Sequence, residues 1–322
     1  MRHDGGVSDF NRTVRPTWCS ALSENEPGGG TAAHESVWVL LEYPGGWGRD
    51  ILDGEALGQD LADRLRAHLK ACGARMLFIR RPGRLGVYVE RPRLYVCQTT
   101  PGARSVRVTT VGGPADLLDL DLSTPAGLSN SEPVHAPIAL VCVHGRRDQC
   151  CAVRGRPVAA QLQQTVGQRL RALDPAAGVW ECSHTSGHRF APVLLLASTG
   201  YTYGSGDIAS YIRAVEAELD GKVTTADLRG RSTWPPLGQV AEIAVRDSGV
   251  AAGIDELTVD VAAARSAEEV AVGERRELTV SHSDGRRWTV EAERVSRSPL
   301  PASCGKDPVV AEVWRAESVR PR

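Results

Sequence analysis

The first hundred residues alternate short apolar runs with one amphipathic segment. Leucines recur at every fourth position across 57–71 and Gly73 follows them, which predicts a helix with a glycine at its C-terminus. The apolar runs are short and bounded by Gly, Pro or polar residues, as buried strands are. Strands are therefore predicted at four places: 37–41, 76–79, 87–89 and 94–97.

A second set of elements follows the turn-rich, acidic stretch 114–137. Its apolar runs predict strands at 138–143, 179–182, 193–197 and 200–204. Helices are predicted at 157–173 and 207–219, and Asp207 and Gly221 suit the two caps of the second helix. The order β-α-β-β-α is that of a thioredoxin-like core. The first set is interpreted as a degenerate copy of it.

The pattern changes again in the C-terminal part of the chain. A helix is predicted at 236–248. Period-two alternation, typical of half-buried strands, follows at 257–261, 277–282 and 287–295. Asp284-Gly285 between the last two is a strong hairpin signal. These elements predict a small α+β unit.

Together the patterns predict an α/β protein in four parts. Residues 1–16 are polar and are expected to form a mobile tail. Residues 17–130 form an N-terminal α/β segment and residues 131–225 the thioredoxin-like domain. Residues 232–322 form the C-terminal α+β domain.

Composition narrows the possible partners and the compartment. The formal net charge of the 322-residue chain is −1, which gives no electrostatic footprint for nucleic acid or an anionic membrane. Apolar runs such as 192–197 are too short to cross a bilayer, and the N-terminus lacks the apolar core of a signal peptide. A cytoplasmic location is expected, where the eight cysteines stay reduced.

Candidate metal ligands gather in the central segment. The set comprises Cys142, Cys150, Cys151, Cys182, His184 and His188. Between the first two cysteines runs a loop of polar side chains: His144, Arg146, Arg147 and Asp148. Residues 185–187 predict a turn that brings the two imidazoles together, and thiolates with imidazoles suit zinc or iron–sulfur centres. The alternative is a pair of buried core cysteines beside a solvated basic turn.

Several motifs resemble the sucrase/ferredoxin-like family. The specific ones are Cys142-x8-Cys151 after a strand, His144-Gly145-x-Arg147-Asp148, and Trp180-Glu181-Cys182-Ser183-His184-x-x-Gly187-His188-Arg189. Supporting motifs lie at Trp18-Cys19-Ser20, Glu42-Tyr43-Pro44-Gly45-Gly46, Arg80-Arg81-Pro82-Gly83 and Leu228-Arg229-Gly230-Arg231. The resemblance covers nearly the whole chain from Trp18 onward.

The resemblance implies a metal centre, because the family includes thioredoxin-like [2Fe–2S] proteins with two Cys and two His ligands. Carried over by position, the implied ligands are Cys142, Cys151, His184 and His188. Cys150 and Cys182 are neighbouring candidates, and Cys151 is preferred to Cys150 on the family spacing alone. The residues expected around the ligands are His144, Arg146, Arg147, Asp148, Trp180 and Arg189.

Such a centre predicts a ferredoxin-like electron carrier. Two neutral imidazoles in place of thiolates raise the reduction potential, and they allow electron uptake to be coupled to proton uptake. The implied partners are a redox donor and a redox acceptor. Two alternatives stay open: a structural zinc scaffold with the same ligands, and a metal-free thiol oxidoreductase that uses Cys150 or Cys151.

Other motifs carry less chemistry. Glycosidase activity is not expected, because the acidic candidates look like solvated surface instead of paired carboxylates; they are Asp116, Asp119 and Asp121. Cys72, Cys97 and Cys304 are expected to be inert, and no chemistry is assigned to Cys19. Arg80 and Arg81 are interpreted as a solvated strand end.

Overall fold

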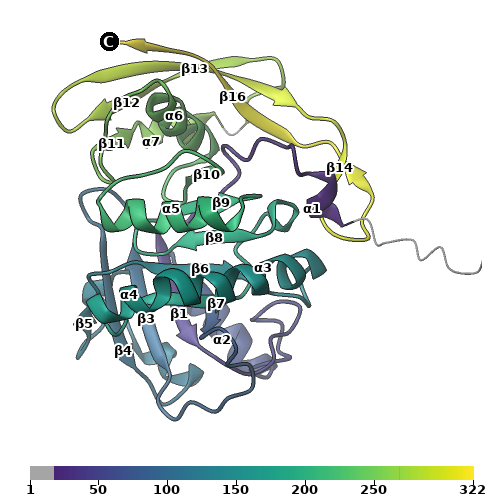
Figure 1. The fold of residues 1–322 in the computed structure, drawn as a ribbon, viewed down its shortest axis with the longest axis vertical. Coiled ribbons are helices and arrows are strands. Elements are labelled where there is room, and N and C mark those ends of the chain that lie inside the picture. The colour runs from purple at the N-terminus through teal and green to yellow at the C-terminus, as the bar shows by residue number, and fades with distance from the viewer. Residues whose placement is uncertain (1–17, 268) are drawn as a thin grey trace, which may run out of the picture.

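A computed structural model describes residues 18–267 and 269–322 as a mixed α/β protein with a large curled sheet and a smaller antiparallel one (Figure 1). The predicted mobile tail, 1–16, lies outside the described residues. The large sheet has ten strands in the order β10-β9-β8-β6-β7-β2-β1-β3-β4-β5. Their bounds are β1 Val37–Glu42, β2 Arg75–Arg80, β3 Arg93–Gln98, β4 Ser105–Thr110, β5 Glu132–Pro133, β6 Ile138–Cys142, β7 Gly178–Cys182, β8 Val193–Leu196, β9 Tyr201–Gly204 and β10 Leu228–Arg231.

The same pairing scheme occurs twice within this sheet. In the first half β1 is parallel to β2 and antiparallel to β3, which is antiparallel to β4. In the second half β6 is parallel to β7 and antiparallel to β8, which is antiparallel to β9. The two halves meet where β2 pairs with β7 in antiparallel register, Ile79 opposite Cys182 and Arg80 opposite Glu181. The chain segments of the two halves therefore form one continuous sheet.

Alternation along the strands sends side chains into two cores, one on each face of the sheet. In β1, Val39 and Leu41 enter one core, while Trp38 and Leu40 enter the other. The first core also receives the apolar sides of the helices α2 (Gln59–Ala71), α3 (Gln149–Leu162) and α5 (Ile208–Leu219). Figure 1 shows α3 and α5 lying along the same face.

Most predicted elements are confirmed, but the helix predicted at 157–173 begins much earlier. Asp148 caps α3 by accepting a hydrogen bond from the backbone N–H of Cys150, so the helix starts at Gln149. Pro157 lies inside the helix, although proline is more typical of a first turn. A π-helical turn at Gln163–Gly167 then leads into α4 (Gln168–Leu173).

The strand predicted at 87–89 is wrong. These residues form an irregular surface loop in which Tyr88 is 84% exposed. Their alternation matches a strand, but the loop offers no neighbouring strand with which to pair. Three strands longer than two residues were not predicted: β4 and β10, which are short and partly polar, and the C-terminal strand at 312–321.

The C-terminal part has its own core and its own sheet. Helix α6 (Pro236–Asp247) packs against the four-stranded sheet β11-β12-β13-β16, as seen at the top of Figure 1. The remaining bounds are β11 Leu257–Val259, α7 Val261–Ser266, β12 Arg275–His282, β13 Arg287–Ser296 and β16 Glu312–Pro321. Gly285, at φ 95°, forms the predicted hairpin turn between β12 and β13.

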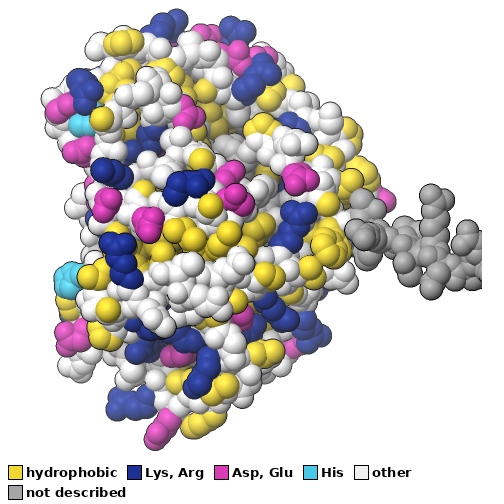
Figure 2. All heavy atoms as spheres, in the orientation of Figure 1, with side chains coloured by type: hydrophobic (Ala, Val, Ile, Leu, Met, Phe, Trp, Pro, Cys, Tyr) yellow, Lys and Arg dark blue, Asp and Glu magenta, His cyan; other side chains and the backbone are white. Residues whose placement is uncertain are grey.

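A small hairpin returns from this C-terminal part to the N-terminus. Strand β14 (Leu300–Pro301) pairs with β15 (Pro308–Val309), and β14 packs against the short helix α1 (Cys19–Leu22). None of the described helices has the length and apolar character needed to cross a membrane. Basic and acidic side chains are interspersed over the face shown in Figure 2.

A buried ion pair sits where the two halves of the large sheet meet. The Nε of Arg80 lies 2.7 Å from Oε2 of Glu181, and both side chains are almost fully buried. The guanidinium also lies 4.0 Å from the centre of the Trp47 ring. The interpretation of Arg80 as a solvated strand end is therefore wrong, because the pairing of β2 with β7 buries its side chain.

Replacing Glu181 with Ala is expected to lower the free energy of unfolding by about 3–5 kcal/mol, because it leaves the Arg80 charge buried without a counter-ion. Urea denaturation measures this loss. Asp60→Ala, which removes a mainly exposed pair with Arg64, is the control and should change stability little. The double variant Arg80→Met/Glu181→Leu should recover most of the loss; no recovery would show that the pair itself is not the cause.

Candidate metal centre

Three of the predicted ligands converge at one end of the large sheet. Cys142 ends β6, Cys151 lies in the first turn of α3, and His184 follows β7. One ligand atom from each lies within 4.8 Å of the other two. Both cysteines are buried and the histidine is half-buried. The group is therefore a pre-assembled thiol–imidazole site with one edge facing solvent.

A glycine allows α3 to approach β6 closely enough to form this site. A Cβ on Gly155 would lie 2.1 Å from the carbonyl oxygen of Cys142. Only a residue without a side chain fits at such a contact. The first turn of α3, with Cys151, is thereby held against the end of the strand that carries Cys142.

His188 lies beside this group and reaches it by a tight loop. Ser186 and Gly187 both have positive φ, 76° and 70°, and a short 3-10 helix begins at His188. The rings of His184 and His188 are 5.1 Å apart between centroids. The turn predicted at 185–187 is confirmed, and it places the two imidazoles next to one another.

Both imidazoles present an unsatisfied nitrogen. The Nδ1 atoms of His184 and His188 are buried and have no hydrogen-bond partner among the described residues. A buried polar atom without a partner is costly unless something else binds it. Together with the two thiols, these orphaned nitrogens fit a metal centre with two sulfur and two nitrogen ligands.

His144 positions the loop that carries His184. Its Nε2 lies 2.7 Å from the carbonyl oxygen of Gly48, so this nitrogen carries the proton. Its Nδ1 can then accept a hydrogen bond from the backbone N–H of His184, at 3.2 Å. This imidazole is fully used in hydrogen bonds, so it acts as a support for the site and not as a ligand.

Two arginines that were not predicted to belong to the site hold the other side of the same loop. Arg75 donates to the carbonyl oxygen of His184 and to the hydroxyl of Ser186, both at 3.1 Å. Arg229 donates to the carbonyl oxygen of Ser186 at 3.2 Å. Both arginines lie far from the histidines in sequence, so local spacing does not connect them to the site. Arg229 at least falls within one of the supporting family motifs, whereas Arg75 does not.

Arg229 places a positive charge beneath the site without a carboxylate partner among the described residues. Its other hydrogen bonds go to the hydroxyl and carbonyl oxygens of Thr31, and its guanidinium lies 4.8 Å from the centre of the Phe190 ring. Complete burial lowers the pKa of Arg229 to about 10. The guanidinium stays charged at neutral pH, so it favours negative charge at the neighbouring site.

The two site thiols share their protons unequally. A hydrogen bond from the Cys151 thiol lowers the pKa of Cys142 well below its usual value, against the opposing effect of burial, and His184 adds to the lowering. The same hydrogen bond and burial raise the pKa of Cys151. Cys142 is therefore the thiol of the pair that more readily becomes a thiolate, the form that binds metals.

The adjacent cysteines Cys150 and Cys151 point to different places. Cys151 faces Cys142, whereas Cys150 lies in a second group with Cys19, Cys304 and Asp148. Cys182 stands opposite Cys142 in the sheet and shares its core, but it belongs to neither ligand group. Neither neighbouring candidate therefore joins the group of Cys142, Cys151 and His184.

The residues expected around the ligands have diverse roles. Arg146 is mainly exposed and pairs with Glu55, and Arg189 pairs with Glu26. The charges of these two arginines are therefore neutralised by carboxylates and not directed at the site.

Trp180 shares the core with the two thiols, and the guanidinium of Arg81 lies 3.6 Å from the centre of its ring. Arg147 is half-buried in the loop, and its backbone N–H donates to the carbonyl of His144.

The arrangement defines a class: α/β proteins whose buried thiol and imidazole side chains could hold a metal ion or cluster. A model of the sucrase/ferredoxin-like family matches residues 29–233 of this chain, which includes every member of the site. The protein belongs to the sucrase/ferredoxin-like family. No curated protein and no solved structure matches the chain.

Replacing Gly155 with Ala should separate Cys151 from Cys142 and lower the free energy of unfolding by about 3 kcal/mol, since the new methyl group meets backbone. Thermal unfolding and the metal content of the purified protein measure the two effects. Gly46→Ala is the control, because a Cβ there meets nothing within 4 Å. Wild-type metal content in the Gly155 variant would contradict the proposed role of this contact.

Proposed function

We propose that Cys142, Cys151, His184 and His188 hold a [2Fe–2S] cluster and that the protein is a ferredoxin-like electron carrier. The observation that supports this most is the convergence of two thiols and an imidazole within 4.8 Å, next to a second imidazole with an unsatisfied nitrogen. When bound, such a cluster accepts and releases one electron. Membership of the sucrase/ferredoxin-like family supports the same assignment.

The strand order supports a thioredoxin-like assignment for the domain that carries the site. The order β7-β6-β8-β9, with α3 joining the parallel pair and α5 after the last strand, follows the β-α-β-β-α scheme. The order β2-β1-β3-β4 repeats it in the first half, with α2 in the place of α3. We accordingly treat the first half as a degenerate copy that has kept the sheet but lost the ligands.

The ligand set favours a reduction potential above that of an all-cysteine ferredoxin. Two neutral imidazoles replace two thiolates, so the site carries less negative charge and gains an electron more readily. The uncompensated Arg229 guanidinium acts in the same direction by stabilising the more negative state. Imidazole ligands also allow a proton to be taken up with the electron.

The half-buried histidines give the electron a route to a partner. A cleft of about 290 Å³ opens beside His184 and is lined by both basic and acidic residues, including Arg75 and Glu35. The proposed partners are a redox donor and a redox acceptor that dock at this edge, and neither a nucleic acid nor a membrane is invoked. All eight cysteines are free of disulfides, in keeping with the expected cytoplasmic location.

Two rival functions use the same residues. A single zinc ion also fits three ligand atoms this close together, which would make the site structural. A metal-free thiol oxidoreductase is less well supported, because Cys150 and Cys151 are completely buried and a substrate disulfide cannot reach them. The lowered pKa of Cys150, about 6 through its hydrogen bond from Cys19, does not remove that obstacle.

Protein purified without oxygen is expected to be coloured, to contain iron and acid-labile sulfide in equal amounts, and to give a rhombic EPR signal after reduction. These spectra and analyses test the cluster directly. Zinc without visible absorption, after reconstitution with iron and sulfide has been attempted, would favour the structural alternative.

His184→Cys and His188→Cys are each expected to lower the midpoint potential by on the order of 100 mV or more, since each adds a thiolate charge to the centre. Redox titration followed by visible absorption measures the shift, and EPR g-values should change with it. Cys182→Ala is the control, because Cys182 lies only two residues before His184, at the end of β7, but belongs to neither ligand group. Unchanged potentials in both histidine variants would remove the imidazoles from the ligand set.

A further inference from the structure

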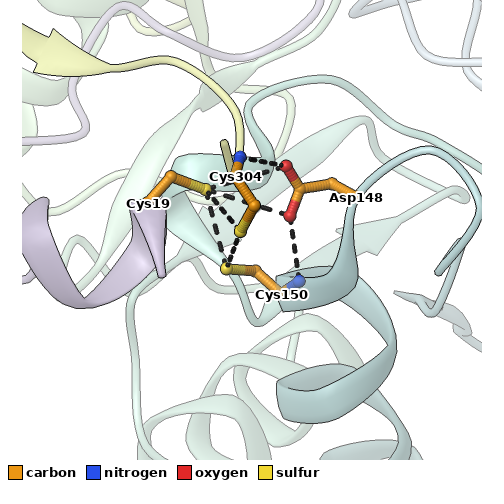
Figure 3. A group of neighbouring side chains, drawn as sticks. All are labelled: Cys19, Asp148, Cys150 and Cys304. Carbon is orange, nitrogen blue, oxygen red and sulfur yellow. Dashed lines mark hydrogen bonds between the residues drawn. The ribbon is translucent and has the colours of Figure 1, made fainter. Parts of the chain in front are cut away.

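Three sulfur atoms from distant parts of the chain meet beside the first site. Cys19 and Cys150 are 3.6 Å apart between sulfurs, Cys19 and Cys304 also 3.6 Å, and Cys150 and Cys304 3.1 Å. Figure 3 shows them with the carboxylate of Asp148, whose oxygens lie 3.8 and 3.9 Å from the sulfur of Cys19. The prediction that Cys304 is inert overlooked this convergence, because sequence spacing gives no sign of it.

These spacings suit one small metal ion. With metal–sulfur bonds of about 2.3 Å, a tetrahedral ion holds its thiolates about 3.8 Å apart and a carboxylate oxygen about 3.6 Å from each sulfur. The sulfur of Cys19 lies 3.6 Å from those of Cys150 and Cys304 and 3.8–3.9 Å from the Asp148 oxygens, which is close to these values; the 3.1 Å between Cys150 and Cys304 widens when the ion binds. The space between the sulfurs is too small for an iron–sulfur cluster, whose ligands bind several metal atoms.

The Asp148 carboxylate is an independent sign that a cation belongs here. Its side chain is completely buried. Within 18–267 and 269–322, no lysine or arginine forms an ion pair with it, and the nearest basic atom is Nε2 of His188 at 3.9 Å. A buried charge without a counter-ion is costly, and a bound metal ion removes that cost.

Hydrogen bonds orient this carboxylate toward the sulfurs. It accepts from the backbone N–H groups of Cys150 and Cys304 and from the hydroxyl of Ser303, at 2.8–2.9 Å. Metal-bound carboxylates are commonly fixed by such donors. A cleft of about 530 Å³, lined by Asp148 and Cys304 among others, connects the group to solvent and gives an ion access.

We propose that Cys19, Cys150, Cys304 and Asp148 form a second metal site, which binds a single zinc-like divalent ion and is separate from the proposed cluster site. Two of its ligands, Cys19 and Cys304, lie outside the residues that the family model matches. The ion joins α1, the start of α3 and the hairpin 300–309. Its role is structural, because four protein ligands leave no open position for a substrate.

A disulfide explains the geometry less well. A disulfide has sulfur atoms about 2.0 Å apart and uses two cysteines. Here one sulfur lies 3.6 Å from each of the other two, which are 3.1 Å apart, and a bond between any two leaves the third thiol unpaired and the buried carboxylate without a counter-ion. A simple apolar core fails for a related reason, because such a core does not include a carboxylate without a counter-ion.

Elemental analysis of the full chain tests the proposal. Wild-type protein, purified without oxygen and dialysed against Zn²⁺, should hold about one zinc ion per chain in addition to any iron. Cys304→Ala and Cys19→Ala should each lower the zinc content by about one ion per chain. The control Cys72→Ala, a half-buried free cysteine outside both groups, should keep it. Cys304 lies in a surface hairpin, so its variant is expected to fold, which circular dichroism checks.

Cobalt provides a readout that does not depend on the first site. Co²⁺ added to metal-free Cys142→Ala/His184→Ala protein, in which the first site is disabled, should give the intense visible bands of a tetrahedral thiolate site, and adding Cys304→Ala should abolish them. Equal zinc content in wild type and Cys304→Ala would overturn the proposal. A Cys150–Cys304 disulfide in the mass spectrum of the anaerobic protein would also overturn it. Iron content and the visible spectrum of the cluster, followed in parallel, report on the proposed carrier function separately.

Discussion

The capping of α3 by Asp148 is the constraint on which both metal groups depend. Because the carboxylate fixes where the helix begins, it also fixes the rotation of its first turn. Successive helical residues point about 100° apart, so the adjacent Cys150 and Cys151 face different surroundings. One sulfur enters the sheet end beside Cys142, and the other enters the space between α1 and the C-terminal hairpin. The position of this cap therefore determines that two adjacent cysteines point into two different groups.

Local sequence was a good guide to the elements but a poor guide to long-range contacts. The buried strands and the helices α2, α5 and α6 follow from periodicity and caps, and the proposed ligands lie in short motifs that fold locally at strand ends. Tyr88 shows the limit for strands, since alternation does not reveal whether a pairing partner exists. Arg80 shows the corresponding limit for charged residues, because its side chain is buried only where two strands distant in sequence pair.

The groups around the site show the same limit. Arg75 and Arg229 support the histidine loop from strands that lie far away in the chain, and no spacing rule connects them to His184. Cys304 reaches Cys150 across 154 residues. Arg146 and Arg189 were near the ligands in sequence, yet each turns to a carboxylate partner. Short sequence motifs pointed to the proposed ligands, whereas tertiary packing determines which charged side chains face them.

The pairing of β2 with β7 makes the two halves of the large sheet depend on one another. If the first half arose as a copy of the second, it has since become indispensable, because it covers the open side of β7 and contributes Arg75 to the loop that carries the histidines. Cutting the chain between the halves would leave a bare strand edge, the kind of surface at which sheets aggregate. The first half therefore protects the edge of β7 and supports the histidine loop, so the second half depends on it for its structure.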